Sequence, residues 1–152
     1  MTRAGDDGGA ATDVAWIALG SNMGNRGAAL ARLRDALQRE GVVIEAASFE
    51  ILTRAVGVTR QPEFHNQVVR VRSPKPLSPH QWLALCKAAE LAAGRKETYR
   101  WGPRVADADI LLLGKRGEIN VNKPDLTVPH AQLRERPFLL RLLAELGLTI
   151  RP

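Results

Sequence analysis

Short apolar segments alternate with segments of helical periodicity along this chain, and that order restricts the folds that it can adopt. Strands are expected over residues 14–19, 42–46, 64–72 and 105–113, with residues 48–52 continuing extended. Helices are expected over residues 28–39, from 79 to the glycine at 94, and over 137–146. Residues 53–62 and 95–104 are predicted to be loops, and residues 115–128 to hold a turn and a short extended piece. The order predicts an α+β sandwich with a largely antiparallel sheet and helices packed on it.

The second helix has the clearest start and stop signals. Ser78 is a suitable N-cap, Pro79 fits the first turn, and Gln81 completes a capping box. Gly94 is a typical stop. The residues expected to face inward from this helix are Trp82, Leu85, Cys86 and Ala89.

Two aspartates lie two residues apart on the last predicted strand. Side chains alternate along a strand, so Asp107 and Asp109 project to the same side, with Cα atoms about 7 Å apart. Two carboxylates this close repel each other unless a cation lies between them, and Mg²⁺ prefers such oxygen ligands. Ala108, Ile110 and Leu112 are expected on the opposite, apolar face. The alternative is an exposed strand with two solvated acids.

The residues before this strand favour the metal–phosphate interpretation. Arg100 and Arg104 flank a Trp-Gly-Pro turn, and arginine side chains bind phosphate oxygens in two-pronged geometry. Trp101 is able to cover a flat ring. The stretch of residues 20–22, before the first helix, resembles a phosphate cradle but is equally well explained as a turn with a cap. Asn66 close to Phe64 suits recognition of a heterocycle, or is merely a strand-edge amide beside a core aromatic.

Composition places the chain among single-domain proteins with anionic partners. It has 152 residues, 45% of them hydrophobic, so it is long enough to bury a core. We expect residues 1–12 to form a flexible leader and residues 13–152 the domain. The only cysteine is Cys86, and no apolar run reaches the roughly 20 residues that span a membrane. These features, with no signal-peptide pattern, predict a cytoplasmic protein. The net charge of +6 favours nucleotides, nucleic acid or acidic membranes as partners.

The motifs together resemble the hydroxymethyl-dihydropterin pyrophosphokinases of folate biosynthesis. The stretch of residues 100–109, Arg-Trp-Gly-Pro-Arg-Val-Ala-Asp-Ala-Asp, matches the most specific signature of that family. Weaker pieces follow in family order: residues 17–22, residues 61–66, Glu90 with residues 94–95, and residues 128–130 with Arg136 and Phe138. The resemblance covers residues 15–146, nearly all of the chain expected to be ordered.

The resemblance implies a three-layer α-β-α sandwich with a ferredoxin-like, mainly antiparallel sheet. It also implies an enzyme, a Mg-dependent 2-amino-4-hydroxy-6-hydroxymethyldihydropteridine diphosphokinase. Such an enzyme transfers the diphosphate of ATP, its co-substrate, to the hydroxymethyl group of 6-hydroxymethyl-7,8-dihydropterin and releases AMP. The residues implied for metal and phosphate are Asp107 and Asp109 for two Mg²⁺ ions, and Arg95 and Arg104 for the polyphosphate. Those implied for the nucleotide are Glu90, Trp101, Ile110, Thr127, His130 and Arg136. Those implied for the pterin are Thr53, Val56, Phe64, Asn66, Trp101 and Phe138.

Two other interpretations stay open at this point. Glu97 stands where the family usually has a second arginine, so a homologue that binds pterin or nucleotide without efficient turnover is the first alternative. A small basic nucleic-acid-binding module is the second, although aromatic residues are only 5% of the chain and no stacked-aromatic motif is visible. For the favoured enzyme we expect small-molecule partners only, no nucleic acid or membrane, and a monomer, with a dimer as the alternative.

Overall fold

The computed structural model describes residues 10–22, 26–53, 64–94 and 106–150. Its strands are β1 (Thr12–Ser21), β2 (Val43–Ala47), β3 (Ile51–Thr53), β4 (Phe64–Leu77), β5 (Asp107–Leu113), β6 (Val121–Lys123) and β7 (Leu126–Val128). Its helices are α1 (Arg26–Arg39), α2 (Pro79–Ala92) and α3 (Pro137–Glu145), with a 3-10 turn, η1 (Leu133–Glu135). Each predicted strand and helix is present within a few residues of its expected bounds. The predicted loop over residues 95–104 lies outside the described residues.

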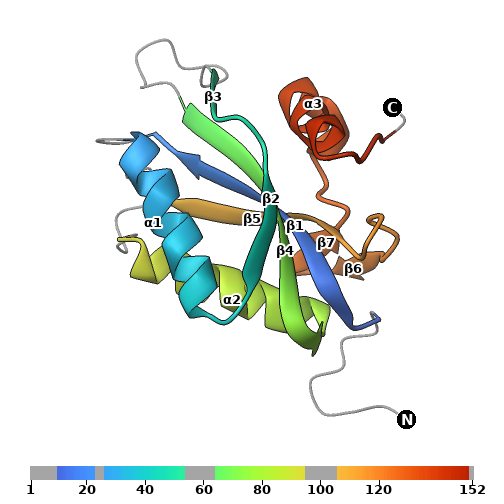
Figure 1. Ribbon diagram of the computed structural model, residues 1–152. Coiled ribbons are helices and arrows are strands. Elements are labelled where there is room, and N and C mark those ends of the chain that lie inside the picture. The colour runs from blue at the N-terminus through green and yellow to red at the C-terminus, as the bar shows by residue number, and fades with distance from the viewer. Residues whose placement is uncertain (1–9, 23–25, 54–63, 95–105, 151–152) are drawn as a thin grey trace.

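The main sheet has the strand order β2-β4-β1-β5, with β3 also paired to β4, and its pairings are antiparallel. Helices α1 and α2 lie on one face of this sheet and α3 lies on the other (Figure 1). The helix between β1 and β2 and the helix between β4 and β5 produce the β-α-β-β-α-β order of a ferredoxin-like fold. The predicted α+β, three-layer α-β-α fold is therefore confirmed.

Each face of the sheet contributes to a separate apolar cluster. The cluster beneath α1 and α2 includes Ile17 and Leu19 of β1, with Trp82 of α2, which is fully buried. The cluster beneath α3 includes Trp16 and Leu111. Alternation along β4 follows the prediction, since the valines at 69 and 71 belong to the first cluster and the one at 68 to the second.

The start of α2 is capped as the sequence predicts. The Ser78 hydroxyl accepts a hydrogen bond from the Gln81 backbone at 3.2 Å, and the Gln81 side chain accepts one from the Ser78 backbone at 2.8 Å. After the helix ends, Gly94 has a φ of 106°, a value that a residue with a Cβ rarely adopts. The four residues predicted to face inward are all buried. This helix is therefore fixed at both ends and along one side.

Some local predictions are wrong. Thr53 was expected in a loop but pairs with Phe64 as the last residue of β3, and strand structure is interrupted over residues 48–50. Where a turn and one short extended piece were expected over residues 115–128, the structure has two short strands, β6 and β7, paired antiparallel over residues 121–128. Leu112 lies in the α3-side cluster, because the pairing of β5 with β1 shifts register at a bulge next to it. The expectation that Leu112 shares a face with Ala108 and Ile110 is thereby corrected.

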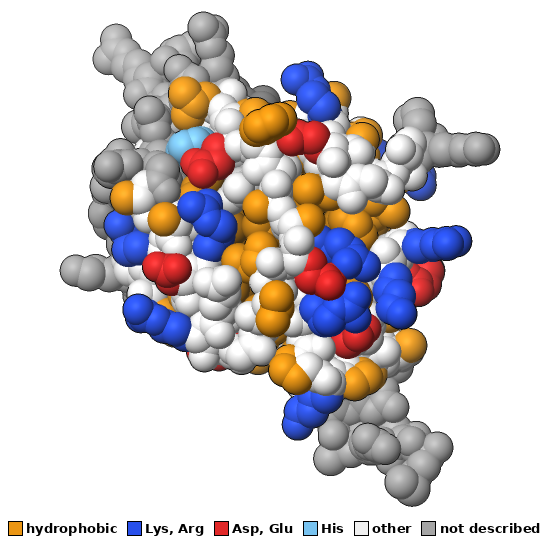
Figure 2. All heavy atoms as spheres, viewed as in Figure 1, with side chains coloured by type: hydrophobic (Ala, Val, Ile, Leu, Met, Phe, Trp, Pro, Cys, Tyr) orange, Lys and Arg blue, Asp and Glu red, His pale blue; other side chains and the backbone are white. Residues whose placement is uncertain are grey.

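No helix in the described part of the chain is long and apolar enough to cross a membrane. On the face shown in Figure 2, basic and acidic side chains lie next to one another instead of forming a single basic patch. Arg72, for example, has ion pairs with Glu45 at 2.9 Å and with Asp13 at 2.7 Å. Basic side chains such as Arg72 are therefore paired with acids in local networks.

Candidate functional site

A small pocket lies on the α3 side of the sheet, where the end of β1 meets the beginnings of β4 and β5. Its volume is about 70 Å³. The residues around it are Ala18, Leu19, Gly20, Phe64, Asn66, Asp107, Asp109, Leu111, His130, Arg136, Phe138 and Leu139. Two acids, an amide, two aromatic rings, a histidine and an arginine therefore meet at one place, and each of these was a predicted site residue.

The sheet register brings these groups together from distant parts of the chain. Gly20 pairs with Asp107 on one side and with Asn66 on the other, so the three lie in one row across the sheet. Because Gly20 has no side chain, the space between the acid and the amide stays open. A Cβ built on it would lie 3.5 Å from Asn66 Oδ1, which is ordinary contact, so the amide oxygen lies over this glycine.

Asp107 and Asp109 project to the same face, as their spacing predicts. The residue between them, Ala108, is buried on the opposite face at 5% exposure, whereas Asp107 is half-buried and Asp109 is exposed. Within the described residues, no group of three or more metal-ligating side chains occurs. The protein thus offers a pair of oxygen ligands, and Mg²⁺ typically takes one or two carboxylates and completes its shell with substrate phosphates and water.

The side chain of Asn66 has a defined orientation. Its Nδ2 donates to the Thr53 hydroxyl at 2.7 Å and to the Phe64 carbonyl at 3.2 Å. These two donor contacts assign the amide orientation and leave Oδ1 as the acceptor. Phe64, at the start of β4, and Phe138, at the start of α3, are half-buried and both line the pocket. The arrangement suits a flat ring whose edge donates a hydrogen bond.

His130 and Arg136 are connected through Gln132. The Gln132 backbone N–H donates to His130 Nδ1 at 3.1 Å, and Gln132 Oε1 accepts from Arg136 Nη2 at 2.7 Å. In a neutral imidazole, a nitrogen that accepts carries no proton, so Nε2 of His130 carries it and is a donor. The His130 backbone N–H also donates to the Leu111 carbonyl at 2.9 Å, which fixes this segment against β5.

Sequence reasoning missed Gln132, although its spacing gave a signal. It lies two residues after His130 and four before Arg136, close enough for a local contact with each. Sequence reasoning considered Gly20 only as part of a possible phosphate cradle over residues 20–22, and it did not predict that the missing side chain of Gly20 keeps space open between Asp107 and Asn66. Neither residue carries the chemistry that a motif search looks for.

Three predicted nucleotide residues lie away from the small pocket. Glu90 is buried on α2 at 3% exposure, and its Oε2 accepts a hydrogen bond from the Ala108 backbone at 2.8 Å. Ile110 packs in the cluster beneath α1 and α2, and Thr127 is exposed on β7. The remaining predicted residues, Val56, Arg95, Trp101 and Arg104, lie outside the described residues, as does Glu97. Their roles stay predictions.

Cys86 lies near the site but has no nucleophilic character. It is 1% exposed, and burial, followed by the negative charges of Glu90 and Asp109, raises the pKa of its thiol well above the ordinary value. The thiol is therefore protonated at neutral pH, and the interpretation of Cys86 as a small buried hydrophobe agrees with this.

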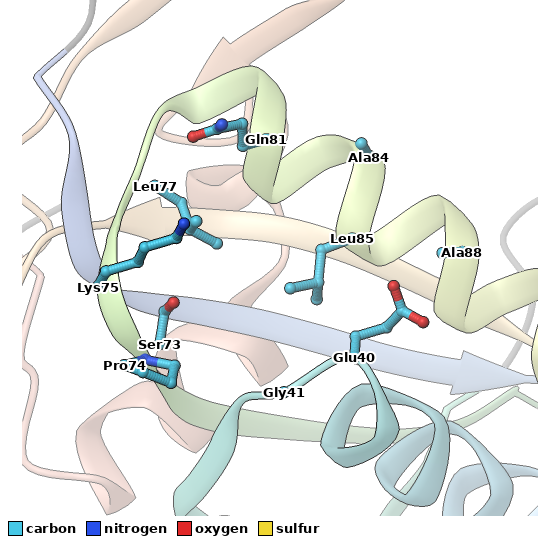
Figure 3. Close-up of a pocket in the computed structure, with 10 residues that line it drawn as sticks. All are labelled: Glu40, Gly41, Ser73, Pro74, Lys75, Leu77, Gln81, Ala84, Leu85 and Ala88. Atoms are coloured by element: carbon cyan, nitrogen blue, oxygen red, sulfur yellow. The ribbon is translucent and has the colours of Figure 1, made fainter.

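A larger hollow of about 670 Å³ lies between the end of α1, the end of β4 and α2 (Figure 3). Leu77, Ala84 and Leu85 line its apolar part, and Lys75 and Glu40 lie at its edges. It contains none of the predicted site residues. The smaller pocket, not this hollow, therefore brings together the residues with the expected chemistry.

The fold and the pocket define a ferredoxin-like α+β domain with paired carboxylates beside an amide and two aromatic rings. Residues 16–147 match the profile of the 7,8-dihydro-6-hydroxymethylpterin-pyrophosphokinase (HPPK) family, and the chain belongs to that family. It is 38% identical over 135 residues to the 2-amino-4-hydroxy-6-hydroxymethyldihydropteridine pyrophosphokinase of Bacillus subtilis. The aligned region covers 88% of this chain and 78% of that protein.

Relatives of this chain differ in length. The mitochondrial folate synthesis bifunctional protein of Arabidopsis thaliana is 41% identical over 133 residues, 86% of this chain but only 23% of that protein. The pyrophosphokinase of Pseudomonas aeruginosa is 34% identical over 137 residues, 90% of this chain and 82% of that protein. The chain thus spans about a quarter of the plant bifunctional protein and most of each single bacterial pyrophosphokinase.

Proposed function

We propose that this protein transfers the diphosphate of ATP to 6-hydroxymethyl-7,8-dihydropterin in folate biosynthesis. The hydroxymethyl oxygen attacks the β-phosphorus, the bond from that phosphorus to the bridging oxygen breaks, and AMP leaves with the bridging oxygen. The observation that carries the proposal is one row across the sheet, in which Asp107, Gly20 and Asn66 are neighbours by register. This row supports a metal–phosphate site beside a ring-binding site, because it brings a carboxylate and an amide together. The family match and the named bacterial relatives support the same reaction, and nothing in the comparisons favours a homologue without turnover.

Asp107 and Asp109 are the proposed ligands of two Mg²⁺ ions. Mg²⁺ held by these two carboxylates would supply positive charge against the negative charge that develops on the phosphates during transfer. Both carboxylates lie on the same face of an edge strand, and β1 fixes their spacing through the pairing of Asp109 with Ala18 and of Asp107 with Gly20. The pair presents oxygen ligands without a third protein acid nearby among the described residues, which leaves coordination positions for phosphates and water.

His130 and Arg136 are the proposed contacts of the chain with the nucleotide phosphates. Because His130 Nδ1 accepts from Gln132, its Nε2–H is available to donate to an anionic oxygen. The guanidinium of Arg136, held by Gln132 Oε1, adds a cation on the same side of the pocket. We propose that Arg95 and Arg104 complete the phosphate contacts and that Glu90, Trp101, Ile110 and Thr127 belong to the nucleotide site.

The pterin is proposed to lie between Phe64 and Phe138 with its polar edge at Asn66. The amide NH₂ of Asn66 is already bonded to Thr53 and to the Phe64 carbonyl, so its Oδ1 is the atom left to accept from a ring N–H. Offset stacking on the aromatic rings orients the ring and brings its hydroxymethyl group toward the carboxylates. Val56 and Trp101 are predicted to complete this part of the site. The single-domain boundaries, the monomeric state and the cytoplasmic location also stay predictions.

The decisive experiment measures AMP release from ATP and Mg²⁺, with and without the pterin. We expect release that depends on the pterin, is lost with EDTA, and falls at least about 100-fold in Asp109→Asn. Asp35→Asn is the matched control, because Asp35 is an exposed acid on α1, on the other face of the sheet. Failure of the wild-type protein to release AMP in the presence of pterin would refute the proposed reaction. Equal losses in both variants would remove the assignment of the metal to β5.

A matched test addresses the pterin site. In Asn66→Asp the donor to Thr53 and Phe64 is lost and a negative charge lies against their oxygens, so the side chain no longer holds its orientation. We expect the KM for pterin to rise at least about ten-fold, with a smaller change in the KM for ATP. A rise confined to the KM for ATP would contradict the placement of the pterin.

A further inference from the structure

Among the described strands, β5 is the last in the order of the main sheet, and β1 is the strand that pairs with it there. The outer edge of an edge strand has backbone groups that no neighbouring strand satisfies. Toward the end of β5, the Leu111 carbonyl accepts from the His130 backbone at 2.9 Å. At the beginning, the Ala108 N–H donates to Glu90 Oε2 at 2.8 Å. A side chain from α2 thus takes the place of a strand at the point between the two aspartates.

We propose that Glu90 is a positioning residue that holds the Asp107–Asp109 segment of β5 in its metal-binding geometry through the Ala108 backbone. This inference rests on the proposed function of the two aspartates. It adds a second role to the proposed place of Glu90 at the nucleotide site, because this contact is with the backbone of the strand and not with a ligand. Glu90 acts on the metal site through Ala108.

The burial of Glu90 supports a structural contact of this kind. It is 3% exposed, and a carboxylate in such a place is costly unless its oxygens accept hydrogen bonds. Lys87 Nζ lies 3.9 Å from Oε1 of Glu90, and the Lys87 side chain is 63% exposed. That ion pair is long and exposed to water, whereas the bond to Ala108 is short and buried. The Ala108 contact is therefore the better-formed of these two interactions.

Geometry explains why this bond matters for the aspartates. Ala108 is the residue between them, and its Cβ is buried on the face opposite to theirs. The Ala108 N–H belongs to the peptide plane between Asp107 and Ala108, so a rotation of that plane changes the backbone torsions on both sides of it and with them the relative directions of the two aspartates. Mg²⁺ demands near-ideal octahedral geometry, so a small rotation weakens its binding. Holding one N–H therefore fixes two ligands.

The test compares Glu90→Gln, which keeps an acceptor oxygen, with Glu90→Met, which has similar length and no oxygen. Glu145→Met is the matched control, because Glu145 Oε1 accepts from the Phe49 backbone at 3.1 Å, the same type of contact on α3. The first measurement is hydrogen exchange of the Ala108 amide in the protein without ligands. We expect exchange to be at least about ten-fold faster in Glu90→Met and near wild type in Glu90→Gln and in the control.

The second measurement is turnover as a function of free Mg²⁺ at saturating ATP and pterin. In Glu90→Met the half-saturating Mg²⁺ concentration is expected to rise several-fold, with the KM for pterin unchanged, and Glu90→Gln is expected to restore most of the loss. Unchanged exchange at Ala108 in Glu90→Met, or a higher KM for ATP with an unchanged Mg²⁺ curve, overturns the inference in favour of direct nucleotide contact. If the wild type shows no pterin-dependent turnover, the proposed reaction fails, and the exchange data still decide whether Glu90 holds the strand.

Discussion

The indole of Trp82 provides the sharpest test of how α2 is attached to the sheet. Trp82 is fully buried, and its Nε1 donates to the carbonyl of Thr12, the first residue of β1, at 3.0 Å. Trp82→Phe leaves that carbonyl without its partner, which costs about 1–3 kcal/mol. It also removes roughly 40 Å³ of side chain, worth about 1 kcal/mol at the usual cost of a cavity. The expected loss of unfolding free energy is therefore about 2–4 kcal/mol.

Urea denaturation followed by circular dichroism measures this loss without depending on tryptophan fluorescence. For a chain of this length the loss corresponds to a fall in melting temperature of about 5–15 °C. Leu91→Ala is the control, because Leu91 is on the same helix and 65% exposed, and a change within about 0.5 kcal/mol is expected. If Trp82→Phe loses no more than this control, the link between α2 and Thr12 makes no contribution to global stability, and the reasoning is refuted.

Three further predictions follow from local contacts. Gly114→Ala is expected to lower the unfolding free energy by about 1–2 kcal/mol in urea titration, because Gly114 has a φ of 100° and a new methyl group would displace the Glu118 carboxylate. Hydrogen bonds from backbone N–H groups lower the pKa of the Glu118 carboxyl below its ordinary 4.5. The contribution of Glu118 to stability is therefore present above pH 4.5 and is lost as the pH falls further. The unfolding free energy of Glu118→Gln should differ from that of the wild type at neutral pH and converge with it in acid. Cys86 should react with a thiol reagent at pH 8 only when the protein unfolds, because burial raises its thiol pKa, and rapid reaction of the folded protein would contradict this.

Local sequence patterns predicted the elements but not all of their connections. The capping box at Ser78 and the alternation of Val68 and Val69 depend on neighbours within a few residues, and both are confirmed. The extension of β4 to Leu77 was missed, because the prolines at 74 and 76 argue against a strand and only pairing with Thr12 reveals it. The hairpin of β6 and β7 was missed for a similar reason, since its strands are only three residues long.

The candidate site shows the same division between local and long-range information. The spacing of Asp107 and Asp109 predicts that they share a face, and the structure agrees. The shared face is the one beneath α3, on which Asn66 also lies. This placement depends on how β5 and β4 pair with β1. No local pattern contains that register. The resemblance to a family predicted the grouping, and the register through Gly20 gives its physical cause.

The bulge in β5 explains how one short strand serves both the core and the site. Before the bulge, Ala108 and Ile110 pack beneath α1 and α2, and the two aspartates face the pocket. At the bulge the register shifts, so Leu111 and Leu112 both pack on the α3 side, and Leu113 returns to the first cluster. Strict alternation would instead place Leu112 with Ile110 and would turn Leu113 to the α3 side. The extra residue therefore decides which leucines pack on the α3 side, while the aspartates before the bulge keep their place on the pocket face.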